Sequence, residues 1–258
     1  MVAAPIGADR WAWGRKLAEK YFERDAERPL TLQTDWTKPW TLVPVCTAAL
    51  LALLAAVSPS FYSSYIQPER GLLEIAQVLI NLSTILIAAM LLTRRARANA
   101  HWLRVWILLM LLGAIYVAGE EASWGQHYLG WATPESWQAV NDQGETNIHN
   151  TSSWFDQKPR ALLEIAVLFG ALLLPLAQRT RFYPRHPKLA YLIPSKRCVP
   201  TAAMVLLARA DDWAGDLLQH GSPLFYRPAE VEELFIYMVI LFYAFDLLRR
   251  VTHQPPPA

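Results

Sequence analysis

The sequence has few of the residues, and none of the short motifs, that mark several large enzyme classes. Its 258 residues include only two cysteines and six histidines. It has no His-Glu-x-x-His motif, no Glu-x-x-His pair of the di-iron bundles, no Gly-x-Ser-x-Gly elbow and no Walker loop. Six histidines are also too few for the histidine-rich boxes of membrane desaturases. These absences exclude the enzyme classes that depend on those motifs.

Charge is also scarce in this chain. Charged residues make up 18% of it, the formal net charge is +2, and no basic patch with interleaved aromatic residues indicates nucleic-acid binding. Cys46 and Cys198 each lie near the start of an apolar segment, which favours core packing over a disulfide or a metal site. Because residues 1–39 are polar and amphipathic, we expect no cleavable signal peptide.

Long apolar runs dominate what is present. Apolar residues make up 53% of the chain, and a membrane-spanning helix needs roughly 17–25 of them in succession. Five runs reach or approach that length and a sixth is more polar: Trp40–Ser58, Gly71–Thr93, Val105–Gly119, Ala161–Gln178, Val231–Leu248 and, as the polar one, Cys198–His220. The sequence therefore predicts an all-α fold, a polytopic membrane bundle of about six transmembrane helices.

Lysine and arginine alternate between the connections, and this alternation predicts the topology. Cytoplasmic loops carry an excess of these residues near the helix ends. The N-terminal segment, the connections 94–104 and 179–197 and the C-terminal end are basic, whereas 59–70, 120–160 and 221–230 are poor in both residues. With six spans, both termini lie in the cytoplasm and the long loop between the third and fourth spans lies outside. The expected location is the bacterial inner (cytoplasmic) membrane.

Three regions follow from this division. Residues 1–39 form a cytoplasmic segment suited to the anionic inner surface of a membrane or, equally, to a solvated tail. Residues 40–250 form the six-helix membrane domain, and residues 251–258, with three successive prolines, form a disordered tail. The outer loop 120–160 holds four tryptophans, which favours a position in the membrane interface, although a small structural cap explains them too.

Acidic residues fall at one end of the predicted spans. An ionisable residue at membrane depth is costly and indicates a functional site. Glu74 and Glu164 open two spans within a repeated Arg-x-Leu-Leu-Glu-Ile-Ala sequence, Glu233 opens the last span, and Glu120 and Glu121 close the third. In the predicted topology all five lie on the outer side, so we expect them to surround one shared site. The simpler interpretation of the three opening residues is that the helix dipole favours a carboxylate at an N-terminus.

The more polar fifth span carries a stripe of functional groups. Arg209, Asp212, Asp216 and His220 follow one another at intervals of three, four and four residues, which places them on one helix face. We expect this stripe in the outer half of the bilayer, where an ion pair would lower the cost of insertion. If this segment were instead a half-span or a surface helix, the predicted topology would change.

Two polar blocks beside the third span form the most specific pattern. They are Gly119-Glu-Glu-Ala-Ser-Trp-Gly-Gln-His127 and Asn141-Asp-Gln-Gly-Glu-Thr-Asn-Ile-His-Asn150. If the second block is helical, Glu145 and His149 share a face, at a spacing that suits a divalent metal or a general acid–base pair. If the third span continues, Glu120, Ser123 and His127 also share a face. The interpretation without a ligand is a solvated histidine and a simple helical side-chain pair.

The two blocks resemble a signature of uncharacterised bacterial polytopic membrane proteins, Glu-Glu-x-Ser-Trp-Gly-Gln followed by Asn-x-Gln-x-Glu-x-Asn-x-His-Asn. The resemblance covers residues 120–150 and the acidic start of the last span, and it implies no activity. The Glu-Glu pair is also similar to that of CAAX-type intramembrane proteases, which carry later histidine motifs. This chain departs from that pattern, because Gly125 stands where the family has arginine. Its Phe-x-x-x-His spacing, Phe182 to His186, falls in a basic loop.

These features lead to the hypothesis of a membrane-embedded enzyme, a metal-dependent hydrolase of a lipid or lipid-linked substrate at the outer face. A divalent metal, most plausibly zinc, would lower the pKa of a bound water. The candidate residues are Glu120, Glu121 and His149 as catalytic groups; Glu121, Glu145, His149, Asp212, Asp216 and His220 as metal ligands; Glu74, Glu164 and Glu233 as supporting acids; and Ser123, Gln126, Asn147, Asn150 and Arg209 as orienting groups.

Two other classes of function fit the same residues. Clustered carboxylates oppose one another's ionisation and can hold or pass protons, so a proton- or cation-coupled membrane carrier is the first alternative. A non-catalytic subunit of a membrane complex, with its acids paired to a partner, is the second. Membrane lipids are the expected surroundings in every case. Bound metal would favour the enzyme, proton-coupled uptake the carrier, and copurification with a stoichiometric partner the subunit.

Overall fold

A computed structural model describes residues 39–68, 71–94, 100–141, 144–148, 151, 153–219, 221–253 and 256–257. These residues are helical or irregular, with no strand among them. The long helical segments are α2 (Pro39–Val57), α4 (Leu72–Arg94), α5 (His101–Glu121), α8 (Ser153–Ala166) with its continuation η7 (Val167–Leu173) and α9 (Leu174–Leu176), α11 (Val199–Leu218) and α12 (Pro228–His253). The short elements are α3 (Pro59–Phe61), η3 (Tyr62–Ile66), η5 (Ser123–Gly125), α6 (Gln126–Leu129), α7 (Glu135–Gln138), η8 (Ala177–Arg179), α10 (Pro187–Leu192) and η9 (Lys196–Cys198).

Four of these segments are long and apolar enough to cross a membrane: α2, α4, α5 and the part of α8 to α9 at residues 158–176. This agrees with the predicted all-α membrane bundle. The helices α11 and α12 coincide with the other two predicted spans, but charged residues interrupt both. In α11 these are Arg209, Asp211, Asp212 and Asp216.

Helix α4 has the construction expected of a helix in lipid. Large apolar side chains such as Leu79 and Leu86 are exposed on one face, whereas Gln77, Asn81 and Thr84 are buried on the other. Polar side chains that face the interior of a bundle can bond to neighbouring groups, while lipid tails accept the apolar face. The buried face of α4 therefore directs polar groups toward α12.

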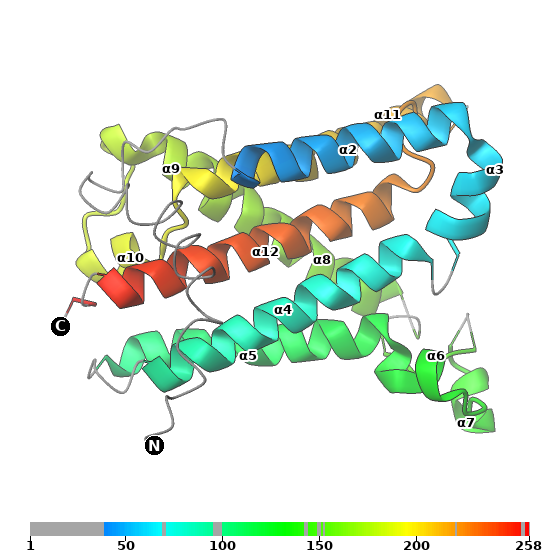
Figure 1. Cartoon of the computed structure of the whole chain (residues 1–258), viewed down its shortest axis with the longest axis horizontal. Helices are drawn as coiled ribbons and strands as arrows, with labels where there is room; N and C mark the ends of the chain where they lie inside the picture. The colour runs from blue at the N-terminus through cyan, green and yellow to red at the C-terminus, as the bar shows by residue number, and fades with distance from the viewer. Residues whose placement is uncertain are drawn as a thin grey trace, which may run out of the picture.

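Helix α12 forms the centre of the bundle (Figure 1). It packs against α4 on one side and α11 on the other, α5 covers the outer side of α4, and α2 lies along α11. Phe235, Ile236 and Leu247 of α12 are almost completely buried. The α8–η7–α9 segment packs against α11 and α12. Its middle is a π-helical stretch that ends next to Pro175, which has no N–H to continue the regular hydrogen-bond ladder.

Consecutive long helices run in opposite directions, so their ends alternate between the two ends of the bundle (Figure 1). The helices α4, α8 and α12 begin where α5 and α11 finish; we name this the acidic end, because Glu121, Glu164 and Glu232 lie there. At the opposite end α12 finishes beside α10. The long helical segments therefore alternate in direction, and four of them are long and apolar enough to cross a membrane.

The opposite end is fastened by a buried ion pair within α12. Arg250 Nη2 lies 2.6 Å from Asp246 Oδ2, and both side chains are almost completely buried. The same Asp246 oxygen accepts a hydrogen bond from the backbone N–H of Ser195 at 3.0 Å, and Arg250 donates to the carbonyl of Tyr191. The pair thus ties the connection between α10 and α11 to the end of α12.

Three sequence predictions need correction. The loop predicted at 120–160 is shorter, because α5 continues through Glu121 and α8 begins at Ser153. The tail predicted at 251–258 is wrong in its first part, because α12 continues through His253. Core packing is correct for Cys198, which is buried, and wrong for Cys46, which is exposed on α2. The predicted N-terminal segment lies outside the described residues except for Pro39.

Candidate functional site

The end of α5 is covered by a polar loop, residues 122–148, which we name the cap. Its described residues bring the two sequence blocks into contact. Glu120, which is buried, accepts hydrogen bonds at 2.7 Å from the indole N–H of Trp124 and from the backbone N–H of Ile148. One carboxylate at the end of the helix therefore bonds to both blocks, and its partner Ile148 lies twenty-eight residues further along the sequence.

A second carboxylate lies in the interior of the cap. Ser123 Oγ donates to Glu145 Oε2 at 2.7 Å, and Asn147 Nδ2 lies 2.5 Å from the same oxygen and 3.0 Å from Ser123 Oγ. Asn141 closes the network, since its Nδ2 donates to Asn147 Oδ1 at 2.9 Å and its Oδ1 accepts from the Glu145 N–H at 3.0 Å. All four side chains are buried.

Backbone geometry explains why this loop needs its particular residues. Ser123, Trp124 and Gly125 all have positive φ values, of 42°, 54° and 103°, so the chain reverses sharply as α5 ends. A Cβ atom on Gly119 would lie 2.8 Å from the Trp124 ring. Gln126 completes the closure, because its Oε1 accepts bonds from Thr146 at 2.8 and 2.9 Å.

The helical spacings proposed for the two blocks do not hold. Residues 144–148 are irregular, so Glu145 does not lie in the helix that the predicted spacing requires. Helix α5 ends at Glu121, and Ser123 starts a separate turn with a left-handed backbone, so Glu120 and Ser123 are not neighbours on one helix face. Polar side chains of the two blocks bond to backbone groups that would otherwise pair within a helix, and this favours a compact loop.

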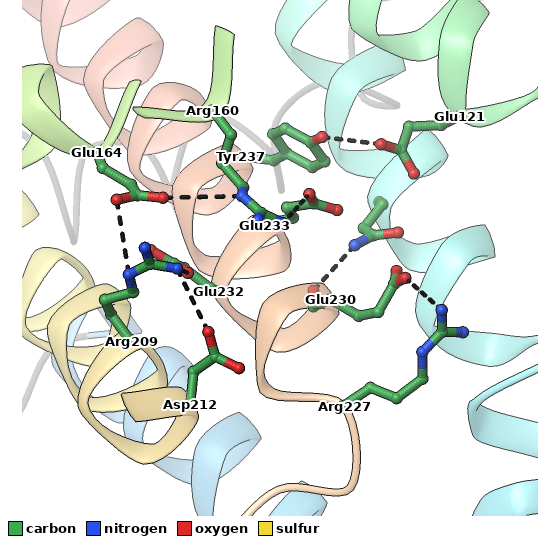
Figure 2. Close-up of polar contacts among 11 residues, drawn as sticks. Glu121, Arg160, Glu164, Arg209, Asp212, Arg227, Glu230, Glu232, Glu233 and Tyr237 are labelled. Carbon is green, nitrogen blue, oxygen red and sulfur yellow. Dashed lines mark hydrogen bonds and ion pairs between the residues drawn. The ribbon is translucent and has the colours of Figure 1, made fainter. Parts of the chain in front are cut away.

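A second polar group lies beside the cap at the acidic end, and we name it the charged cluster (Figure 2). Its members are Arg160 and Glu164 of α8, Arg209 and Asp212 of α11, and Glu232 and Glu233 of α12. It therefore joins three helices at one point. Four carboxylates face two guanidinium groups, which leaves a formal excess of two negative charges.

Arg209 is the centre of the charged cluster. Its guanidinium lies 3.4 Å from Asp212, 3.7 Å from Glu232 and 3.8 Å from Glu164, and it also lies over the ring of Trp213 at 5.4 Å. One cation thus serves three carboxylates from three helices. The ionised forms of all three cannot be equally well compensated, since each new contact shares the same charge.

Arg160 serves the second half of the cluster. It lies 3.3 Å from Glu233 and 3.7 Å from Glu164, so Glu164 bridges the two arginines. Glu164, Glu233 and the arginines keep between a fifth and just over a quarter of their side-chain surface exposed. Glu232 differs from them, because its side chain has no exposed surface.

Glu121 lies at the edge of this cluster, toward α4 and α5. Tyr237 of α12 donates a hydrogen bond to it at 2.8 Å, as Figure 2 shows. The carboxylate also interacts electrostatically with Glu233, Glu230 and Glu74. The partner of Glu121, at the C-terminus of α5, is thus the phenol of Tyr237 on a neighbouring helix.

The structure therefore divides the predicted site residues among neighbouring groups. Ser123, Gln126, Glu145 and Asn147 belong to the cap, and Glu120 of α5 bonds to it. Glu164, Arg209, Asp212 and Glu233 belong to the charged cluster, and Glu74 and Glu121 lie at its edge. Asp216 is exposed. Asn150, His149 and His220 lie outside the described residues.

The predicted metal ligands are not brought together within the described part of the chain. Glu121 bonds to Tyr237, Glu145 lies in the cap, and Asp212 pairs with Arg209. No group of three or more His, Cys, Asp or Glu side chains in the described ranges is arranged to hold a metal. The metal site, which also depends on the two undescribed histidines, stays a prediction.

Several residues of the acidic end were not predicted from the sequence. Glu232 and Arg160 adjoin predicted residues, but adjacency alone did not indicate which acid of the Glu-Glu pair faces the interior. Buried Asp211 accepts bonds at 2.8 and 2.9 Å from the backbone N–H groups of Leu224 and Phe225, and so fixes the connection between α11 and α12. The sequence signal for Asp211 was its position next to the predicted residue Asp212.

Comparison with family models, with curated proteins and with solved structures finds no match to this chain. Function must therefore be argued from the geometry of the cap and of the charged cluster.

Proposed function

We propose that the chain is a multi-pass protein of the bacterial inner membrane, with six spans, both termini in the cytoplasm and the acidic end outside. The alternating directions of the helices (Figure 1) and the poverty of lysine and arginine in the connections at the acidic end support this topology. Exposed Trp124, Tyr128 and Leu129 of the cap suit a position at the membrane interface.

Cysteine labelling tests the topology. Ser136 and Arg185 are exposed. Ser136 belongs to α7 and Arg185 precedes α10, and these two helices lie at opposite ends of the bundle (Figure 1). In a Cys46→Ser background, a membrane-impermeant maleimide should label Ser136→Cys in intact cells and Arg185→Cys only after permeabilisation. The buried Cys198 provides the unreactive control. The reverse pattern would overturn the topology.

Within this topology, the function that the geometry supports best is a proton- or cation-coupled membrane carrier. The observation that carries the proposal is the excess of carboxylates in the charged cluster, where four acids from three helices share two arginines. An excess of carboxylates over guanidinium groups inside a helix bundle is costly, and taking up a proton or a cation lowers that cost.

The enzyme hypothesis draws less support from the described residues. A metal-dependent hydrolase needs its ligands at one point. Glu121, Glu145 and Asp212 instead belong to separate groups with partners of their own. That hypothesis now depends on His149 and His220.

Charge displacement in proteoliposomes tests the carrier proposal without knowledge of its substrate. Purified protein would be reconstituted, adsorbed on a solid-supported membrane, and exposed to a jump in pH or, at constant pH, in Na⁺. A transient current above that of protein-free liposomes is expected for wild type and for Asp216→Asn, the exposed control on α11. A Glu164→Gln/Glu233→Gln variant should lose most of it.

Currents equal to those of empty liposomes in both jumps would refute the carrier proposal. Metal analysis of the same preparations addresses the enzyme hypothesis. Stoichiometric zinc, lost on His149→Ala, would favour the hydrolase instead.

A further inference from the structure

We infer that Glu232 is the proton-binding group of the charged cluster and that Arg209 is its counter-ion when it is ionised. The inference rests on the proposed carrier function and goes further, because it names the ion and the residue that takes it. Glu232 projects from the first turns of α12 toward the Arg209 guanidinium (Figure 2).

The surroundings of Glu232 distinguish it from the other acids of the cluster. Its side chain has no exposed surface, and neither carboxylate oxygen accepts a hydrogen bond from the described residues. Arg209 Nη1 approaches to 3.7 Å, which is an ion pair without hydrogen-bonding geometry. Glu233, by contrast, is partly exposed and accepts a hydrogen bond from Arg160 at 3.3 Å. Glu232 is thus the acid whose ionised form is least well solvated.

A proton suits this position better than a metal cation. A cation beside Glu232 would lie next to the Arg209 guanidinium and be repelled by it. Metal cations also need several oxygen ligands, and no grouping of metal-binding side chains occurs in the described ranges of the chain. A proton neutralises the carboxylate without occupying new volume or requiring further ligands.

The binding step is simple to balance. A hydronium ion gives its proton to a carboxylate oxygen of Glu232: one O–H bond of the hydronium ion breaks, one O–H bond forms on the carboxyl group, one water is released, and the side-chain charge changes from −1 to 0. Arg209 then loses one of its three carboxylate partners but keeps Asp212 at 3.4 Å and Glu164 at 3.8 Å. Asp212 and Glu164 are partly exposed, so the cluster has an accessible side from which a proton can arrive.

Charged groups on three helices act directly on Glu232. They are Glu164 and Arg160 on α8, Arg209 on α11 and Glu233 on α12. Asp212 on α11 shares the Arg209 guanidinium with Glu232, and Glu121 on α5, Glu74 on α4 and the Arg227–Glu230 pair where α12 begins are further charged groups of the acidic end. The carboxylates oppose ionisation of Glu232 and the arginines favour it. The pH at which Glu232 changes state is set by this whole group.

Infrared difference spectroscopy of the full-length protein in lipid nanodiscs tests the inference directly. As the pH falls, a protonated carboxylic acid gives a C=O stretching band that shifts in D₂O. Wild type and Asp216→Asn should show a component of this band that Glu232→Gln lacks. Arg209→Gln should retain that component and show it already at a higher pH, because the neighbouring positive charge is gone.

The outcomes separate this inference from the carrier proposal. If Glu232→Gln keeps the complete C=O band of wild type, the inference is wrong even where proteoliposomes give a current. It is also wrong if Na⁺, added to wild type at constant pH, suppresses the component of the band that Glu232→Gln lacks. If the component disappears in Glu232→Gln while no charge displacement occurs in either jump, proton binding at Glu232 stands and the carrier proposal fails. If Glu232→Gln does not fold, Arg209→Gln decides the question. A band that appears at the same pH in Arg209→Gln as in wild type would refute the pairing of Glu232 with Arg209.

Discussion

Removing one partner of the Asp246–Arg250 pair should destabilise the protein strongly, and removing both should cost much less than the sum. The ionic groups are 2.6 Å apart and almost completely buried. Breaking such a pair leaves an uncompensated buried charge, at a cost of about 3–5 kcal/mol, and this is a large part of a typical total stability of roughly 5–15 kcal/mol. We therefore expect losses in this range for Arg250→Met and for Asp246→Asn.

The double variant Asp246→Leu/Arg250→Met leaves neither charge of this pair buried without its partner, although it also loses the bonds to Ser195 and Tyr191. A double-mutant cycle with Asp246→Leu, Arg250→Met and the combination should give a coupling energy of about 2 kcal/mol or more. SDS-induced unfolding in mixed micelles measures each difference. Exposed Asp216→Asn is the control. Single losses below about 1 kcal/mol, or additive losses, would refute the argument for an interior ion pair.

Three further predictions concern the loops and the pH range. Asp211→Ala leaves two backbone donors of the α11–α12 connection without their carboxylate, and the loss at the buried Phe225 N–H should cost roughly 1–3 kcal/mol, with less for the part-buried Leu224 N–H, whereas exposed Asp216→Ala should be nearly neutral in the same unfolding assay. Gly119→Ala should force the cap tryptophan from its place and speed proteolysis within residues 122–148, because the new Cβ would meet the indole ring at 2.8 Å; unchanged proteolysis would contradict the packing. Burial raises the pKa of Tyr62 and Tyr191 from 10.0 to about 12, so their neutral forms favour the folded state; this stability is fully present below pH 10 and is lost as the pH rises through 12. A variant with phenylalanine at both tyrosine positions should therefore lose less stability over that window in pH-dependent unfolding.

Apolar run length was enough to predict the long helices. The run at 71–93 became α4 (Leu72–Arg94), and the polar run at 198–220 became α11 (Val199–Leu218). Inside a bilayer there is no water to bond to the backbone, so an apolar run of spanning length satisfies its hydrogen bonds within itself as a helix. The placing of Glu121 and Glu164 at the same end of the bundle also followed from counting, because consecutive long helices joined by short connections must alternate in direction.

Partners within the site could not be predicted in this way. Glu233 was expected at the site and Glu232 was not, since adjacent residues of a helix differ by about 100° in direction and only the packing of α12 decides which faces inward. Glu145 was assigned a helical spacing that its loop does not have. Its partners, Ser123 and Asn147, come together through a left-handed turn that local sequence preference does not predict.

The sequence by itself determined that this chain forms long apolar helices, where most of them begin and end to within about five residues, and that five of its glutamates gather at one end. Those properties depend on local composition and on chain direction. Only the tertiary structure decided that the acids divide between the cap and the charged cluster, that Tyr237 meets Glu121, and that Glu232 is enclosed beside Arg209. Such contacts join residues tens to more than a hundred positions apart, and they are fixed by how helices pack and rotate against one another, which composition does not specify.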